Sequence, residues 1–259
     1  MPTRRGQGTV KWPTRRGHRL RVGNMTYLVH SLEEVLVASV IAFDVNETLL
    51  DLDALDAPFE ALLGRAALRP QWFSLMLQLA FTGGLTGQYV DFTAAQRAAL
   101  AMLAEREGLP LAPSDIDGLV NRMSSLPPHP EVPGALAALA RTRLRLVALT
   151  NSVQQVAEAQ LTGAGLSGYF EAVISADSTG HLKPAPQPYH AVAGRCGVRA
   201  GDVRLVAAHS WDIAGALAAG CQAAFVARPG MVLSPLGGRP GITGPDLDSV
   251  ASQIITIDG

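Results

Sequence analysis

A single stretch decides the fold: residues 40–50, VIAFDVNETLL. Its first four residues are apolar, and such a short run before polar residues predicts a strand that is buried on both faces. Asp44 would stand at the carboxyl end of this strand, and the Thr48 hydroxyl can reach the same point from the following loop. Ligands of open parallel sheets bind at that end, so Asp44 is a candidate nucleophile. For one isolated Asp after a strand, a helix cap is the simpler interpretation, and other segments must decide between the two.

Strand and helix patterns alternate in the second half of the chain. Apolar, β-branched runs predict strands at 144–149, 172–175, 203–208, 223–226 and 254–257. Helical patterns predict helices at 153–161, 189–195 and 213–219. Strands separated by helices of this length imply right-handed βαβ crossovers. We therefore expect an α/β fold with a doubly wound parallel sheet.

A helical block separates the first strand from the others. The pattern is helical over 52–63 and from Pro70 to about Pro128, and Thr93 begins a capping box for a helix that Gly108 ends. A proline cluster at 127–133 would return the chain to the sheet. This organisation predicts a core made of residues 38–57 and 132–259, with an all-helical domain at 58–131 inserted into it.

The composition indicates a soluble body with a basic N-terminal tail. Of the 259 residues 48% are hydrophobic, and no apolar run approaches the roughly 20 residues that span a membrane. Residues 1–32 carry seven Lys or Arg and no acid, whereas the rest carries 14 basic and 22 acidic residues. We expect residues 1–30 to be disordered, because they are rich in Gly and Arg. The acidic body excludes a nucleic-acid surface outside this tail.

The two cysteines, Cys196 and Cys221, are not spaced as metal ligands. They are typical of buried thiols in a reducing compartment, although one bridge between them stays open. Paired arginines occur near the N-terminus, but no apolar export segment follows them. We therefore expect a cytoplasmic protein.

Polar side chains follow four of the predicted strands. They are Asp44 after the first strand, Thr150, Asn151 and Ser152 after the second, Lys183 beyond the third, and His209 and Asp212 after the fourth. A lone Lys or His in a loop is usually only solvated, and Ser152 is most simply a helix cap. Parallel strands, however, place their carboxyl ends at one edge of the sheet, so we expect these groups to converge.

In order and spacing, these residues resemble the motifs of the haloacid dehalogenase superfamily. The resembling segments are DVNET at 44–48, TNS at 150–152, KP at 183–184 and HSWD at 209–212, followed by AGA at 214–216. The resemblance covers about residues 38–258. It implies a Rossmann-like core and identifies the helical block as the cap domain of this superfamily.

Within the superfamily, the residues are more similar to type II 2-haloacid dehalogenases than to phosphatases. Phosphatases place a second Asp two residues after the nucleophile, where this chain has Asn46. The fourth motif, the spacing from Lys183 to Tyr189, and Trp72 all resemble the dehalogenase pattern. Phe73 stands where that group has a halide-binding Arg, and His209 stands where it has Asn.

The resemblance implies a hydrolase that forms a covalent ester on Asp44. Asp44 would attack C2 of a short 2-haloacid and expel halide, and water would then hydrolyse the ester at the Asp44 carbonyl. Lys183 would keep Asp44 ionised. Asp212, with His209, would position or deprotonate the water, with His209 acting as a neutral imidazole.

The resemblance also implies which side chains contact the substrate: Thr48, Asn46, Thr150, Asn151, Trp72, Phe73, Tyr189 and Trp211. Halide leaves without a proton, so we expect no metal ion or other cofactor. The expected partner is a small-molecule substrate, with neither a membrane nor nucleic acid, and a homodimer stays open.

Three alternatives remain. A magnesium-dependent phosphatase would use Asp44, Asp212 and the backbone carbonyl of Asn46 as metal ligands. A hydrolase of this family could also act on another small substrate. A non-enzymatic binding module that uses the basic tail is the third, but a retired active site has no physical reason to keep the charges of Asp44, Lys183 and Asp212 buried together.

Overall fold

The computed structural model describes residues 19–22, 25–28 and 37–259. The chain divides into two units, residues 1–36 and 37–259. In the first, strands β1 (Arg19–Val22) and β2 (Met25–Leu28) pair in an antiparallel manner. The sequence predicts no strand here, and the rest of the predicted disordered tail lies outside the described residues.

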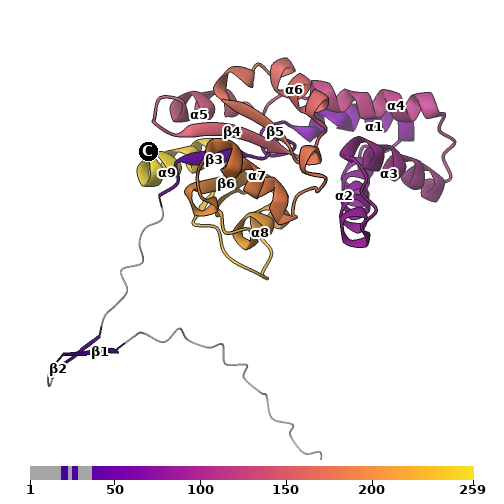
Figure 1. Cartoon of the computed structure of the whole chain (residues 1–259). Helices are drawn as coiled ribbons and strands as arrows, with labels where there is room; N and C mark the ends of the chain where they lie inside the picture. Colours follow the sequence, from indigo (N-terminus) through magenta and orange to yellow (C-terminus); the bar gives the residue numbers. More distant parts are fainter. Residues whose placement is uncertain (1–18, 23–24, 29–36) are drawn as a thin grey trace, which may run out of the picture. The chain divides into compact units, whose positions relative to one another are not determined.

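The second unit is built on a six-stranded sheet in which all neighbouring strands run parallel. The strand order is β5-β4-β3-β6-β7-β8, so the chain starts near the middle, builds one side and then crosses to the other (Figure 1). The strands are β3 (Val40–Phe43), β4 (Arg145–Thr150), β5 (Ala172–Ser175), β6 (Val203–Ala207), β7 (Gln222–Val226) and β8 (Ile242–Gly244). The predicted doubly wound α/β fold is thereby confirmed.

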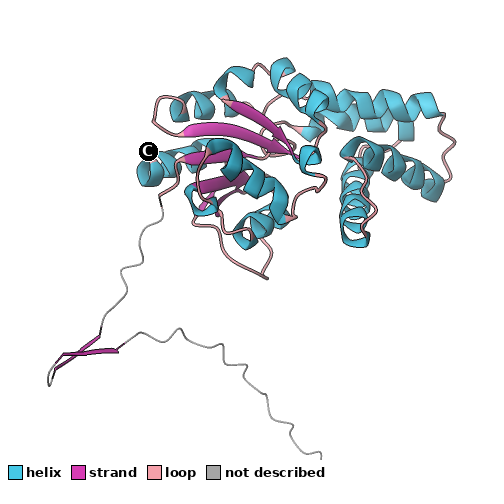
Figure 2. Ribbon diagram, in the orientation of Figure 1, coloured by secondary structure: helices cyan, strands magenta, loops and turns pink. Residues whose placement is uncertain are grey.

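Helices cover both faces of this sheet (Figure 2). One face is covered by α5 (Val132–Leu139), α6 (Gln154–Gly163) and α9 (Leu247–Asp258), and the other by α7 (Pro186–Cys196) and α8 (Ser210–Ala218). Successive side chains of a strand point to opposite faces, which explains why Ile41 and Phe43 belong to one apolar cluster and Val40 and Ala42 to the other. All four side chains are buried, as a two-sided sheet requires.

Helices alone connect β3 to β4 in the described chain. They are the 3₁₀ helix η1 (Leu52–Leu55), α1 (Asp56–Leu63), α2 (Leu68–Thr86), α3 (Phe92–Glu107), α4 (Pro113–Asn121), the 3₁₀ helix η2 (Arg122–Ser125) and then α5, which packs on the sheet. Further 3₁₀ turns lie outside this block: η3 (Ser167–Tyr169), η4 (Ala176–Thr179) and η5 (Ala200–Asp202). Both cysteines are buried free thiols, and no helix of the described residues is long and apolar enough to cross a membrane.

Two local predictions are wrong. Residues 254–257 belong to helix α9 and not to a strand, because Asp246 caps the helix and the buried residues Val250, Ala251 and Ile254 follow helical spacing. The edge strand is β8 instead. Helix α3 begins before Thr93, because the carboxylate of Asp91 accepts the backbone N–H of Ala94.

Gly215 in α8 lets this helix approach the loop that carries Lys183. A Cβ at this position would lie 2.5 Å from the Tyr189 hydroxyl and 2.8 Å from the Pro184 carbonyl oxygen. We expect Gly215→Ala to lower the free energy of unfolding by roughly 1–3 kcal/mol, the usual cost of overpacking. Gly194→Ala in α7 is the matched control, because nothing lies within 4 Å of its added Cβ. Urea unfolding of both variants measures the difference, and equal stabilities would contradict the predicted close packing.

Candidate active site

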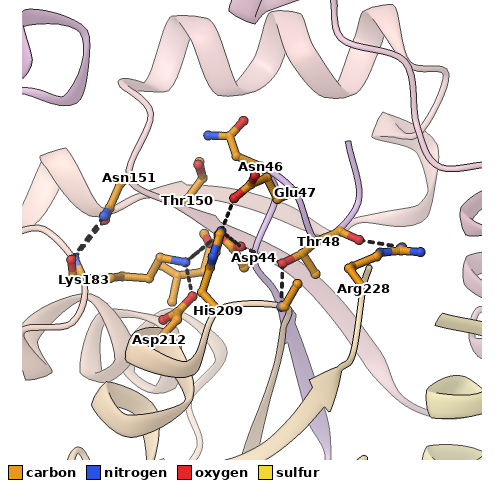
Figure 3. Close-up of polar contacts among 12 residues, drawn as sticks. Asp44, Asn46, Glu47, Thr48, Thr150, Asn151, Lys183, His209, Asp212 and Arg228 are labelled. Atoms are coloured by element: carbon orange, nitrogen blue, oxygen red, sulfur yellow. Dashed lines mark hydrogen bonds and ion pairs between the residues drawn. The ribbon is translucent and has the colours of Figure 1, made fainter. Parts of the chain in front are cut away.

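Asp44 directly follows β3, and the loop after it holds its carboxylate from one side. The Thr48 hydroxyl donates to Asp44 Oδ2 over 2.7 Å and accepts the backbone N–H of Ala208 over 2.9 Å (Figure 3). Thr48 thus ties the nucleophile loop to the end of β6. The Asp44 side chain is only 6% exposed.

Lys183 holds the carboxylate from the other side. Its ammonium donates to Asp44 Oδ1 over 2.8 Å and to Asp212 Oδ2 over 2.6 Å, and it is fully buried (Figure 3). The amide of Asn151 fixes the backbone of Lys183, since Asn151 Oδ1 accepts the Lys183 N–H and Asn151 Nδ2 donates to the Lys183 carbonyl. The segments that follow β3, β4 and β6 therefore all contact Lys183, which itself lies in the loop after β5.

The charges of this cluster control its pKa values. Burial acts to raise the pKa of Asp44, but the charge of Lys183 outweighs it and the pKa is lowered. Burial acts to lower the pKa of Lys183, but Asp212 and Asp44 outweigh it and the pKa is raised. For Asp212, burial prevails over Lys183, and the pKa is raised. Asp44 is therefore the carboxylate that stays ionised most readily.

Tyr189 forms a hydrogen bond with the carboxylate of Asp212. Its hydroxyl donates to Asp212 Oδ1 over 2.5 Å, and burial followed by the charge of Asp212 raises its pKa well above 10. Asp212 also lies in the first turn of α8, where the helix dipole favours a negative charge. Both Asp212 oxygens thus have a donor, one from Tyr189 and one from Lys183.

His209 lies between two aromatic rings. It stacks on Phe73 with ring centroids 5.6 Å apart and on Trp211 with centroids 5.1 Å apart. It holds the N-cap position of α8 but makes no capping hydrogen bond, so its ring is free for other contacts. His209 Nε2 lies 3.9 Å from Asp44 Oδ2 and 3.4 Å from Glu47 Oε2.

A small pocket opens in front of Asp44. Its lining consists of Asp44, Asn46, Phe73, Phe92, Asn151, Lys183, His209 and Trp211. The free space is about 10 Å³, close to what one water molecule requires. Phe73 and Phe92 come from the helical block between β3 and β4, so that block closes the pocket.

The structure brings seven of the twelve residues predicted from sequence into this lining: Asp44, Asn46, Phe73, Asn151, Lys183, His209 and Trp211. Asp212 and Thr48 lie behind it and bind Lys183 and Asp44, and Tyr189 binds Asp212 in turn. The hydroxyl of Thr150 accepts the backbone N–H of Ser152. Trp72 is fully buried within the helices, where its Nε1 donates to the carbonyl of Gln96.

Three residues at the site have no role predicted from the sequence. Phe92 lines the pocket, Glu47 faces His209, and Arg228 donates to the carbonyl of Thr48 over 2.7 Å. For Phe92 the sequence carries a signal, because residues 88–92, QYVDF, resemble a Tyr-x-x-Phe segment of the dehalogenase cap. For Glu47 the indication is structural, since it is the only described non-glycine residue with a positive φ, 59°.

Comparison with known proteins identifies the family. The model of the haloacid dehalogenase-like hydrolases matches residues 38–220. The chain belongs to the haloacid dehalogenase-like hydrolase family. It is 31% identical over 216 residues to haloacetate dehalogenase H-2 of Moraxella sp. (strain B), covering 83% of this chain and 96% of that protein.

Two comparisons involve Xanthobacter autotrophicus. Its (S)-2-haloacid dehalogenase is 33% identical over 190 residues, covering 73% of this chain and 74% of the relative. A solved structure of an L-2-haloacid dehalogenase from this organism, with chloropropionic acid covalently bound, superposes with a TM-score of 0.79 at 27% identity. That alignment covers 84% of this chain and 98% of the other.

The phosphatases of this superfamily imply a magnesium ion between the two carboxylates, and the residues of this chain do not fit one. The Lys183 ammonium already bridges Asp44 and Asp212. Asn46 brings no second carboxylate two residues after Asp44, and its amide is engaged, because its Oδ1 accepts from Gln160 and its Nδ2 donates to Ser152. The described residues hold no group of three or more His, Cys, Asp or Glu side chains that could bind a metal ion.

Lys183→Met should destabilise this family member by roughly 3–5 kcal/mol at pH 7, because it leaves two buried carboxylates without their cation. The lowered pKa of Asp44 contributes stability above the ordinary Asp pKa of about 3.9, and the raised pKa of Lys183 contributes below its ordinary value of about 10.4. The deficit should therefore persist between these limits and shrink as the pH falls below about 3.9 toward the lowered pKa of Asp44.

The matched control is Arg97→Met, which removes an exposed ion pair with Asp117 and should cost about 1 kcal/mol or less. Guanidinium unfolding of wild type and both variants at several pH values measures these differences. A Lys183→Met protein as stable as Arg97→Met at pH 7 would show that the cluster is not held together by this charge.

Proposed function

We propose that this protein hydrolyses the carbon–halogen bond of a short 2-haloacid through a covalent ester on Asp44. The observation that carries the proposal is the position of the Lys183 ammonium, which binds Asp44 and Asp212 beside a closed aromatic pocket. Relatives that cover most of this chain are named for the same reaction.

The first step is displacement at carbon. An ionised oxygen of Asp44 attacks C2, the new carbon–oxygen bond forms as the carbon–halogen bond breaks, and the halide departs with the electron pair. The lowered pKa of Asp44 keeps this carboxylate ionised. The leaving halide takes no proton, so the step needs no general acid.

The substrate anion needs donors other than a halide-binding arginine, because Phe73 occupies that position. Asn46 and Asn151 line the pocket. The Trp211 Nε1–H is buried and has no hydrogen-bond partner among the described residues. We assign this N–H, with Asn151, to the substrate carboxylate or the halide.

The second step is hydrolysis of the ester. Water attacks the Asp44 carbonyl carbon, which releases the hydroxy acid and regenerates the carboxylate. His209 lies close enough to Asp44 to take a proton from this water. Asp212, which shares Lys183 with Asp44, balances the charge of the ammonium while Asp44 is esterified.

The remaining assignments are part of the same proposal. Residues 58–131 act as the cap over a core made of 38–57 and 132–259, and Phe73 and Phe92 are its contribution to the pocket. The reaction uses no cofactor. The protein acts in the cytoplasm on a small molecule, without a membrane or nucleic-acid partner, as a monomer or homodimer.

The covalent step can be tested by a single turnover with enzyme in excess, in ¹⁸O-labelled water and excess chelator. The label should appear on Asp44, in the peptide spanning residues 40–50, and be absent from most of the first hydroxy acid formed. Mass spectrometry of peptide and product reads both. Asp44→Asn is the control and should form neither product nor labelled peptide.

Label found only in the product would exclude the ester. Turnover of phosphate monoesters that stops in chelator and returns with magnesium would favour the phosphatase alternative instead.

Tyr189→Phe should lower kcat about tenfold or more and leave KM nearly unchanged. Tyr189 contacts Asp212 and not the pocket, and a hydrogen bond to a charged group contributes about 1.5–3 kcal/mol. Tyr169→Phe is the control, because Tyr169 is half-buried outside the site. Steady-state halide release measures both constants. A raised KM with unchanged kcat would instead place Tyr189 against the substrate.

A further inference from the structure

We propose that Glu47 carries the proton of each turnover out of the catalytic pocket, receiving it from His209 and releasing it to solvent. This inference rests on the proposed function. Glu47 is not among the residues to which the proposed function gives a role.

The proposed reaction produces one proton in a closed space. Its balance is RX + H₂O → ROH + X⁻ + H⁺. During ester hydrolysis one water proton moves to His209 Nε2 as the water oxygen bonds to the Asp44 carbonyl carbon. The ester bond then breaks, and the departing oxygen takes the second water proton. Asp44 is again a carboxylate, and His209 is left as an imidazolium.

The imidazolium must lose its proton before the next turnover. Phe73 and Trp211 both stack against the ring, and the N–H protons of an imidazolium point outward in the ring plane, so they leave through the ring edge. At that edge, His209 Nε2 lies 3.4 Å from Glu47 Oε2. In the Ser-His-Asp triad the same imidazole nitrogen likewise accepts a proton and passes it on, so this double use is chemically sound.

Glu47 lies between the catalytic pocket and a second pocket nearer the surface. It is not part of the catalytic pocket's lining, and it lines the second pocket together with Asp51, Asp53, His129 and Arg228. The Glu47 side chain is 13% exposed, whereas that of His209 is 6% exposed. The contact between these two residues therefore connects the inner pocket with the outer one.

The carboxylate of Glu47 is suited to accept a proton. Its Oε2 is buried and has no hydrogen-bond partner among the described residues, so no donor competes for it. Burial raises the pKa of Glu47 above its ordinary value, although His209 and Arg69 oppose the shift and Asp44 and Asp53 support it. A proton acceptor works best when its pKa lies near the working pH.

The backbone holds Glu47 in a conformation that side chains rarely adopt. With φ at 59°, this residue is in the left-handed region, which costs about 1 kcal/mol or more. The contacts of the loop maintain it: His129 Nε2 lies 3.1 Å from the Glu47 carbonyl, and Arg228 donates to the Thr48 carbonyl. Such strain, maintained by its surroundings, is typical of functional sites.

A purely structural role is the competing explanation. Glu47 Oε1 lies 3.8 Å from Arg69, which also pairs with Asp53 and Asp56. Because Arg69 has these other partners, it does not depend on Glu47 for its charge balance. A structural role predicts a change in stability, whereas a proton-transfer role predicts a change in one kinetic step.

Glu47→Gln separates the two, because it keeps the shape of the side chain and cannot accept the proton. Rapid mixing of enzyme with chloroacetate should give a first-turnover release of chloride at the wild-type rate. Steady-state release should fall at least about tenfold. The ester should accumulate, visible as added mass on the peptide spanning residues 40–50. Glu105→Gln, an exposed carboxylate outside the site, is the matched control and should behave like wild type.

Chemical rescue of the rate and the pH dependence of the rate are two measurements that a purely structural role of Glu47 would not change. Added formate, a small proton acceptor, should restore part of the steady-state rate of Glu47→Gln and leave wild type unchanged. In wild type, the steady-state rate should fall as the pH drops through the raised pKa of Glu47, above the ordinary value of about 4.3. Glu47→Gln should lack this dependence.

Each outcome decides. A slowed ester hydrolysis with formate rescue supports the inference. It is overturned by a Glu47→Gln enzyme with wild-type turnover, by an equal loss in the first turnover and the steady state, or by a loss that formate does not relieve. If wild type itself forms no ester and releases no chloride, the proposed function fails, and the inference fails with it.

Discussion

The site depends on one buried ammonium shared by two buried carboxylates. Lys183 is one of only two lysines in the chain, and its charge is neutralised wholly inside the protein. Removing either partner would leave a charge in a low-dielectric interior, so the cluster forces three strand ends into one arrangement. Asp44 follows β3, Asp212 follows β6, and the Lys183 loop follows β5. The strand order places β3 beside β6, where the chain changes direction and doubly wound folds bind ligands.

Aromatic rings set the second constraint. Phe73 from the helical block and Trp211 from the core hold His209 between them, so the two parts of the chain share one stack across the pocket. The stack leaves about 10 Å³ of free space, close to what one water molecule requires, and electrostatic contacts in such a low-dielectric pocket are stronger than in bulk water. The helical block contributes only Phe73 and Phe92 to the lining, so the polar side chains of the pocket all come from the core.

The charged residues of this site can be predicted from the sequence more readily than the aromatic residues that line its pocket. Asp44, Lys183 and Asp212 could be predicted, because each follows a strand and parallel strands end at one edge. Trp72 and Phe73 are neighbours on α2, and one helical step turns their side chains about 100° apart. The motif therefore identified the right segment, whereas only packing could show that Trp72 enters the helical core and Phe73 reaches the pocket.

Other features required tertiary contacts. The isoleucines near the C-terminus are typical of a strand, but the Asp246 cap and the burial of one face make the segment a helix. Tyr189 has the spacing of a substrate contact, yet α7 directs its hydroxyl to Asp212 from behind. Glu47 could not be assigned, because its role depends on a positive φ and on a histidine 162 positions later in the chain.

The position of the acid–base groups follows from the chemistry of the leaving group. A phosphate ester needs a proton on its departing oxygen, and the superfamily supplies it from the residue two positions after the nucleophile. Here that residue is Asn46, and its amide is engaged by Gln160 and Ser152. A departing halide needs no proton, so the proposed reaction has proton transfers only in its second step. The titratable groups around Asp44 match this requirement, because His209 approaches the oxygen that Thr48 also binds, and Glu47 lies beyond it. The site is thus arranged to manage the proton of a water molecule and not that of a leaving group.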